Sequence, residues 1–246
     1  MTATVTPPPG APGLTRVDPA VRLEDYRSSL VFYLGLLGKC LDAIVFAENS
    51  QADLSVLRAA VAEAGQAGRV EFLVFDGMDR PPSYGRCYGE ARILDHAMAH
   101  SRIVTEARDD SVFWKVTGRY KVRNLEAVLA SRPPQFDLYC DLRHSRTPWA
   151  DMRLMAWTKS GHAQMFKGIG EAIREDTNGG RPGEETLYHE LRQRVVGRCA
   201  VTCLTREPLI DGVRAFDNQN WSHGRQKMVY YLRSLQRMLL LRRVWF

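Results

Sequence analysis

Short apolar runs alternate with stretches of helical apolar spacing in the first half of the chain. Residues 23–39 carry apolar side chains at helical spacing, and the uniformly apolar run 43–47 that follows is typical of a buried parallel strand. The order repeats, with a helix predicted over 54–64 and a strand over 70–75. This alternation predicts an α/β fold with a mostly parallel, doubly wound central sheet flanked by helices.

The second half continues the alternation less regularly. We predict helices over 90–100, 124–130, 184–196 and 225–246, and strands over 111–116, 136–140 and 200–204. Between residues 146 and 183 the pattern predicts loops and one helix, over 162–174. The sequence shows no internal repeat and no inter-domain linker, which favours a single domain over residues 17–246. Residues 1–16, rich in Pro, Thr and Gly, are predicted to form a disordered tail.

Polar residues follow each predicted strand of the first half. Glu48, Asn49 and Ser50 end the first strand, and Asp76 with Gly77 ends the second. In parallel sheets of this kind, ligands bind beyond the carboxyl ends of the strands. The sequence therefore places these side chains on one edge, as candidates for binding a nucleotide.

Composition and charge indicate which kind of partner and which compartment to expect. The 246 residues are 45% hydrophobic and 25% charged, with a formal net charge of +6, which indicates an anionic partner without identifying it. Neither a membrane-spanning run nor a secretory signal is predicted. Five scattered cysteines are typical of reduced thiols, so we expect a cytoplasmic protein.

Two further segments suggest phosphate chemistry. The stretch 83–89 is rich in Tyr and Gly, and its Gly85, Arg86 and Gly89 precede the helix that opens at Glu90. Glycines let backbone amides approach phosphates, although this spacing matches neither a Rossmann fingerprint nor a P-loop. The second segment places Lys115, Thr117, Gly118 and Arg119 at the end of a strand, where two cations could neutralise a diphosphate. An ordinary turn remains an alternative for each segment.

The order of these motifs resembles bacterial and viral surface-polysaccharide glycosyltransferases of the GT-A kind. The matching segments are VFAENS (45–50), GRCYGEARIL (85–94), KVTGRYKVRNL (115–125), Asp151-Met152-Arg153, the helix start at 184–188 and the segment 208–212. Together they span residues 22–237. The sequence departs from the pattern at Cys87, where the family has glycine.

The resemblance implies a single GT-A domain that transfers a sugar from a nucleotide-sugar donor to a glycan or lipid-linked acceptor. It implies no cofactor, and no metal site is predicted, because Lys115 and Arg119 stand where many such enzymes place metal-binding aspartates. The donor-binding candidates are the residues already named: Glu48, Asn49, Ser50, Asp76, Gly85, Arg86, Gly89, Glu90, Lys115, Thr117, Gly118 and Arg119.

Inverting transfer requires a carboxylate that accepts the proton of the acceptor hydroxyl. Glu185, at a predicted helix start, resembles the residue that supplies this base, and Asp151 is the second candidate. The alternatives are a favourable interaction of Glu184 and Glu185 with the helix dipole and a salt bridge between Asp151 and Arg153.

The predicted helix over 225–246 combines arginine and lysine with large apolar residues. Such a helix suits peripheral contact with the inner face of a membrane, which would bring it to a lipid-linked acceptor. Docking on the domain or on another subunit are the alternatives.

Two other functions stay open at this point. A non-catalytic module of glycosyltransferase type could bind glycan or a partner enzyme. Binding of nucleic acid is suggested by charge alone, but the basic residues are dispersed and no recognised module appears, so no nucleic-acid partner is predicted.

Overall fold

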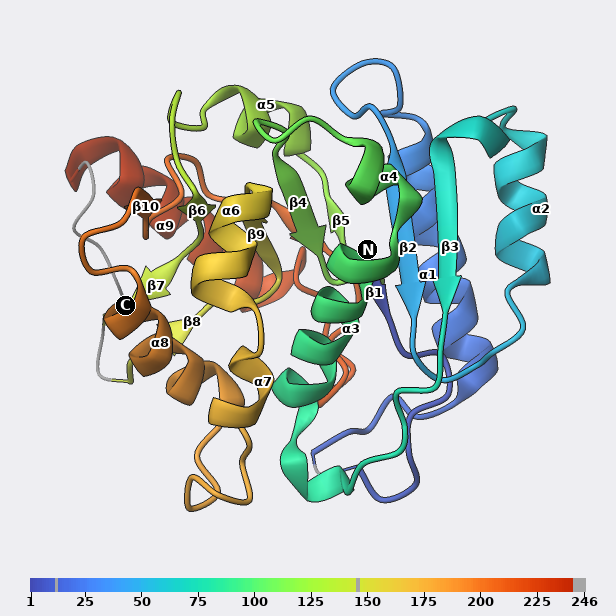
Figure 1. Cartoon of the computed structure of the whole chain (residues 1–246), viewed down its shortest axis with the longest axis horizontal. Coiled ribbons are helices and arrows are strands. Elements are labelled where there is room, and N and C mark those ends of the chain that lie inside the picture. Colours follow the sequence, from blue (N-terminus) through green and yellow to red (C-terminus); the bar gives the residue numbers. More distant parts are fainter. Residues whose placement is uncertain (12, 145–146, 241–246) are drawn as a thin grey trace.

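The computed structural model describes residues 1–11, 13–144 and 147–240 and has a mixed α/β architecture (Figure 1). Its three-stranded sheet contains β1 (Thr2–Ala3), β2 (Ile44–Glu48) and β3 (Val70–Val74), all parallel. Its four-stranded sheet contains β4 (Phe113–Val116), β6 (Leu138–Tyr139), β9 (Leu154–Trp157) and β10 (Ala200–Val201). A parallel bridge between Thr2 and Thr117 joins β1 to the end of β4.

The joined strands lie in the order β3-β2-β1-β4-β9-β6-β10. The strand β9 pairs antiparallel with β4 and β6, and β10 runs parallel to β6. The carboxyl ends of the parallel strands therefore share an edge with the start of β9. Strand order reverses between β1 and β4, and in doubly wound sheets such a reversal is where ligands bind. We call this part of the sheet the switch edge: the carboxyl ends of β1, β2 and β4, the residues that follow them, and the side chains that bond to these residues.

Helices cover both faces of the joined sheets. Behind the strands in Figure 1 lies α1 (Pro19–Leu34), which packs against α2 (Ser55–Glu63). In front lies α3 (Arg86–His100), which packs against α7 (Ile169–Ala172) and α8 (Gly183–Arg194). Two buried apolar clusters result, one containing Leu30, Phe46 and Leu57, the other Leu94, Trp157 and Leu187.

Shorter elements connect these layers. They are the helices α4 (Arg102–Glu106), α5 (Leu125–Ala130) and α6 (Lys159–Gly161), a π-helical turn His162–Phe166, 3-10 turns Ala67–Arg69 and Pro82–Tyr84, and the antiparallel pairs β5 (Lys121–Val122) with β11 (Ile210–Asp211) and β7 (Leu142–Arg143) with β8 (Trp149–Ala150). The last described helix is α9 (Gly224–Leu240). Among the described helices, none has the length and apolar character needed to cross a membrane.

The expected disordered tail is wrong for its first residues. Thr2 and Ala3 form β1 in the middle of the joined sheets, and the Val5 side chain is buried. The Arg22 guanidinium, at the start of α1, donates to the carbonyls of Thr4 and Val5 and fastens this segment. The prolines that follow, at 7–9, led to the prediction of disorder for the whole segment, and the short strand before them was missed.

Three other expectations need correction. The strand β9 was not predicted, although all four of its residues are buried. The stretch expected as a loop over 83–89 is helical from Arg86, because Gly85 takes a φ of +86° and opens α3. The helix expected over 162–174 is interrupted, and Gly168 at φ +70° separates its two parts. Residues 241–246 of the last predicted helix lie outside the described residues.

Gly118 permits the contact between β1 and β4. Its amide donates to the Thr2 carbonyl at 2.9 Å, and a Cβ on residue 118 would lie 2.6 Å from that oxygen. We expect Gly118→Ala to lower the free energy of unfolding by about 1–3 kcal/mol, because backbone would have to move. Gly68→Ala is the matched control, since its Cβ would meet nothing within 4 Å. Urea unfolding measures both variants, and equal stability would contradict this role of Gly118.

Candidate functional site

Asn49 forms the first part of the switch edge. Its buried Oδ1 accepts a hydrogen bond from Thr4 Oγ1 at 2.7 Å, which joins β2 to the end of β1. Its Nδ2 is buried and has no hydrogen-bond partner among the described residues. A buried amide donor without a partner is uncommon in folded proteins and marks a place where a ligand or water can accept.

Glu48 and Ser50 build the turn beside Asn49. The buried Glu48 carboxylate accepts from the backbone amides of Val5 and Ser50, both at 3.0 Å, and from the hydroxyl of Ser50. Ser50 Oγ also accepts from the Thr6 amide at 2.9 Å. With these bonds made, the two side chains shape the turn and are not free to bind the donor that the sequence assigned to them.

A buried ion pair forms the second part of the switch edge. Lys115 Nζ lies 2.6 Å from Glu90 Oε1, and the Lys115 side chain is only 1% exposed. The same Glu90 oxygen accepts from Thr2 Oγ1 at 2.8 Å and from Thr117 Oγ1 at 3.1 Å. Lys115 also donates to the Met152 carbonyl. Thr2, next to Thr117, lies in β1, and Thr4, next to Asn49, directly follows β1, so this short segment connects the two parts.

Arg119 does not join Lys115, contrary to the single cationic group expected from the sequence. Its buried guanidinium lies 3.6 Å from Asp25 of α1 and donates to the Val213 carbonyl at 3.2 Å. Lys115 instead pairs with Glu90 of α3, on the opposite face of the sheet. The turn at Gly118 sends the two cations to different helices, which the spacing alone did not reveal.

Glu184 lies beside this ion pair and was assigned only a dipole role by the sequence. It opens α8, and its carboxylate accepts from the buried Cys87 thiol of α3. Burial raises the pKa of Glu184 above 4.5, and the charge of nearby Glu90 adds to the rise. Gly183 allows this close approach, because a Cβ there would lie 2.5 Å from Cys87 Cβ. The adjacent pair of glutamates was the only signal in the sequence.

The two predicted bases have different surroundings. Asp151 is buried and bonded to both Arg143 and Arg153. Burial alone would raise the pKa of Asp151, but the two guanidinium groups outweigh it and hold that pKa well below the usual range. A carboxylate so strongly stabilised is a poor proton acceptor. Glu185 is partly buried in the first turn of α8, next to Glu184.

The remaining predicted donor residues lie around the switch edge rather than in it. Asp76 is exposed and accepts from the Met78 amide, and Arg86 is exposed in the first turn of α3. Gly85 and Gly89 have no side chain and so leave room for others. The Glu175 carboxylate lies against Gly85, and the Arg80 guanidinium lies against Gly89.

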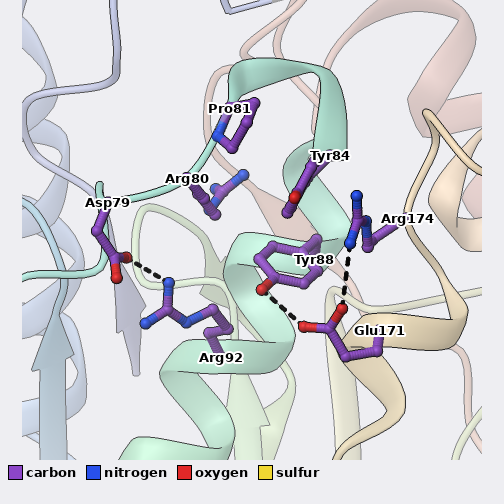
Figure 2. Close-up of a pocket in the computed structure, with 8 residues that line it drawn as sticks. All are labelled: Asp79, Arg80, Pro81, Tyr84, Tyr88, Arg92, Glu171 and Arg174. Carbon is purple, nitrogen blue, oxygen red and sulfur yellow. Dashed lines mark hydrogen bonds and ion pairs between the residues drawn. The ribbon is translucent and has the colours of Figure 1, made fainter.

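A pocket of about 490 Å³ opens beside the first turns of α3 (Figure 2). It is lined by Asp79, Arg80, Pro81, Tyr84, Tyr88, Arg92, Glu171 and Arg174. Arg92 pairs with Asp79 at 2.5 Å, while Arg174 lies 3.5 Å from the centre of the Tyr84 ring. The Arg80 Nε is buried without a hydrogen-bond partner among the described residues. Cations beside aromatic faces suit an anionic or ring-bearing ligand.

A second, smaller pocket lies between the sheet edge and α9. Its lining includes Arg153, Glu207, Trp221, Tyr230 and Arg233. Arg153 immediately precedes β9, and its carbonyl accepts a hydrogen bond from the Thr117 amide. This pocket therefore adjoins the switch edge. Burial lowers the pKa of Arg233 to about 10, and the neighbouring Arg143 contributes. Arg233 lies 3.8 Å from Glu207, so the pocket is lined by an ion pair as well as by aromatic rings.

No group of three or more His, Cys, Asp or Glu side chains in the described ranges is arranged to hold a metal ion. The cysteines are unpaired thiols, with Cys87 and Cys140 buried.

Comparison with known proteins adds no family to this picture. No protein-family model matches the chain, and no curated protein matches it.

Proposed function

We propose that the chain is a glycosyltransferase that transfers a sugar from a nucleotide-sugar donor to a glycan or lipid-linked acceptor. One observation carries the proposal: the Lys115–Glu90 pair and the Glu184 carboxyl of raised pKa meet at the edge where strand order reverses. A carboxyl of raised pKa near a buried ion pair, at a position that binds ligands in doubly wound sheets, is typical of a catalytic site.

The sheet order supports a GT-A kind of domain. The run β3-β2-β1-β4 is the order of a Rossmann-like half, and residues from three of the motifs that resemble surface-polysaccharide glycosyltransferases lie where it reverses. Asn49, Glu90, Lys115 and Thr117, taken from three separate motifs, are connected there through Thr2 and Thr4.

In the proposed reaction, the bond between the sugar's anomeric carbon and the diphosphate breaks as the acceptor oxygen attacks that carbon. Glu184 accepts the proton of the acceptor hydroxyl, and the nucleoside diphosphate leaves with the bonding electrons. Attack from the face opposite the leaving group inverts the anomeric centre. Lys115 and Arg153 supply positive charge near the departing diphosphate, which supports transfer without a divalent metal.

Nucleotide sugars should stabilise the chain against heat. We expect UDP-, GDP- or dTDP-linked sugars, tested one by one, to raise the melting temperature, with a rise of several degrees for the true donor at saturation. The shift should be the same with Mn²⁺ and with chelator. Free sugars serve as the control. If no nucleotide sugar raises the melting temperature, the proposal fails; a shift that requires Mn²⁺ would refute only its metal-independent form.

A non-catalytic module that binds glycan or a partner is the second candidate. The engagement of Glu48 and Lys115 in internal bonds favours it, since neither is free for substrate without rearrangement. If nucleotide sugars bind but no sugar is transferred to any acceptor, the chain is a non-catalytic module.

A further inference from the structure

The helix α9 directs two of its four charged side chains, Arg233 and Arg237, towards the domain. Arg237 is buried and lies 2.5 Å from both Asp141 and Glu207. Arg233, one turn earlier, lies 3.8 Å from Glu207. The face of α9 that contacts the domain therefore includes a buried ion-pair cluster, next to the partly buried Val229 and Tyr230.

The outward face of α9 is apolar. Six large side chains on it are between 52% and 76% exposed: Met228, Tyr231, Leu232, Leu235, Met238 and Leu239. At 3.6 residues per turn they fall within an arc of about 120°, so they form one continuous stripe. We call these six residues the apolar stripe. A contiguous apolar surface of this kind marks an interaction site.

Cations border the apolar stripe on both sides. Both cations lie in the first turn of α9, where the helical rotation places Arg225 just outside one angular edge of the stripe and Lys227 just outside the other, and both side chains are exposed. Residues 224–240 contain no Asp or Glu. Any surface that covers the stripe therefore meets positive charge at its borders and no negative charge from α9.

We propose that the apolar stripe binds the surface of an anionic lipid bilayer, with α9 lying parallel to that surface. Apolar side chains enter the boundary between headgroups and acyl chains, while Arg225 and Lys227 meet anionic headgroups from either side. A second copy of the chain is a poorer occupant, because a two-fold contact through this stripe would bring these cations together without acidic partners from α9. The proposal is independent of the catalytic one.

Vesicle flotation of the full chain tests this surface. The vesicles contain either phosphatidylcholine alone or an equal mixture of phosphatidylcholine and phosphatidylglycerol. We expect the wild type to float with the mixed vesicles, and binding to weaken as salt rises. Leu235→Glu, in the middle of the stripe, should reduce binding at least about tenfold. Arg225→Gln with Lys227→Gln should reduce it on the order of tenfold and remove the preference for anionic lipid.

The matched control is Val56→Glu. Val56 is 48% exposed on α2, at the opposite side of the molecule from α9 in Figure 1, and its replacement should leave flotation unchanged. Light scattering after size exclusion and circular dichroism establish that each variant is folded. Absence of flotation with mixed vesicles would overturn the proposal. So would a wild-type dimer that Leu235→Glu converts to monomer, since that result assigns the stripe to a second copy.

Discussion

Glu184→Gln is expected to lower the rate of sugar transfer by about 10²–10⁴-fold, the usual contribution of a general base. The amide keeps the shape of the side chain but cannot accept the acceptor proton. Glu185→Gln is the matched control, because it removes the same charge one residue along α8 and should change the rate by less than about threefold. Transfer is measured by release of nucleoside diphosphate with saturating donor and a panel of acceptors.

The pH dependence of stability gives an independent check on Glu184. Its pKa in the folded chain is raised above 4.5, so folding favours the protonated form, and that contribution to stability is lost as pH rises through the folded pKa. Gln resembles the protonated acid. Glu184→Gln should therefore become more stable, relative to wild type, as pH increases from 4.5 towards neutrality. Equal losses of transfer in both variants, or a stability difference that does not change with pH, would contradict the assignment.

Arg237→Ala is expected to cost about 3–5 kcal/mol of stability, the range for removal of one partner from a buried ion pair. The substitution leaves Asp141 and Glu207 without their main cation; Asp141 is 1% exposed and Glu207 is 4% exposed. Urea unfolding measures the loss. Amide exchange in α9 shows whether this helix detaches before the rest of the domain unfolds.

Arg225→Ala is the control on the same helix, and it should change stability by less than about 0.5 kcal/mol because the side chain is exposed. A loss below 1 kcal/mol for Arg237→Ala would mean that the buried cluster does not hold α9 to the domain.

The repeated helices and strands of the first half were predictable because each has a clear local pattern of apolar and polar residues. The run 43–47 became β2, and 54–64 became α2, with ends displaced by one residue. Two central strands were not predictable in the same way. The strand β1 has two residues in a threonine- and proline-rich segment, and β9 has four residues without flanking turn signals. Both are specified by pairing with distant strands rather than by local pattern.

The candidate site was predicted in part for a related reason. Strand ends indicated that Asn49 and Thr117 would lie on one edge, and both are connected to β1 there. Side-chain direction was not predictable: Lys115 and Arg119 lie on one short segment but pair with acids of different helices. The contact between Glu184 and Cys87 was not predictable either, because it depends on how closely α8 packs against α3 at Gly183.

Hydrogen–deuterium exchange with a saturating nucleotide sugar tests the central claim most directly, because it locates the bound donor on the chain. We predict slower exchange in peptides that cover residues 47–51 and 115–119, the two parts of the switch edge, and at the start of α8. Protection confined to the pocket around Arg80 and Arg174, or no change in exchange with any nucleotide sugar, would contradict it.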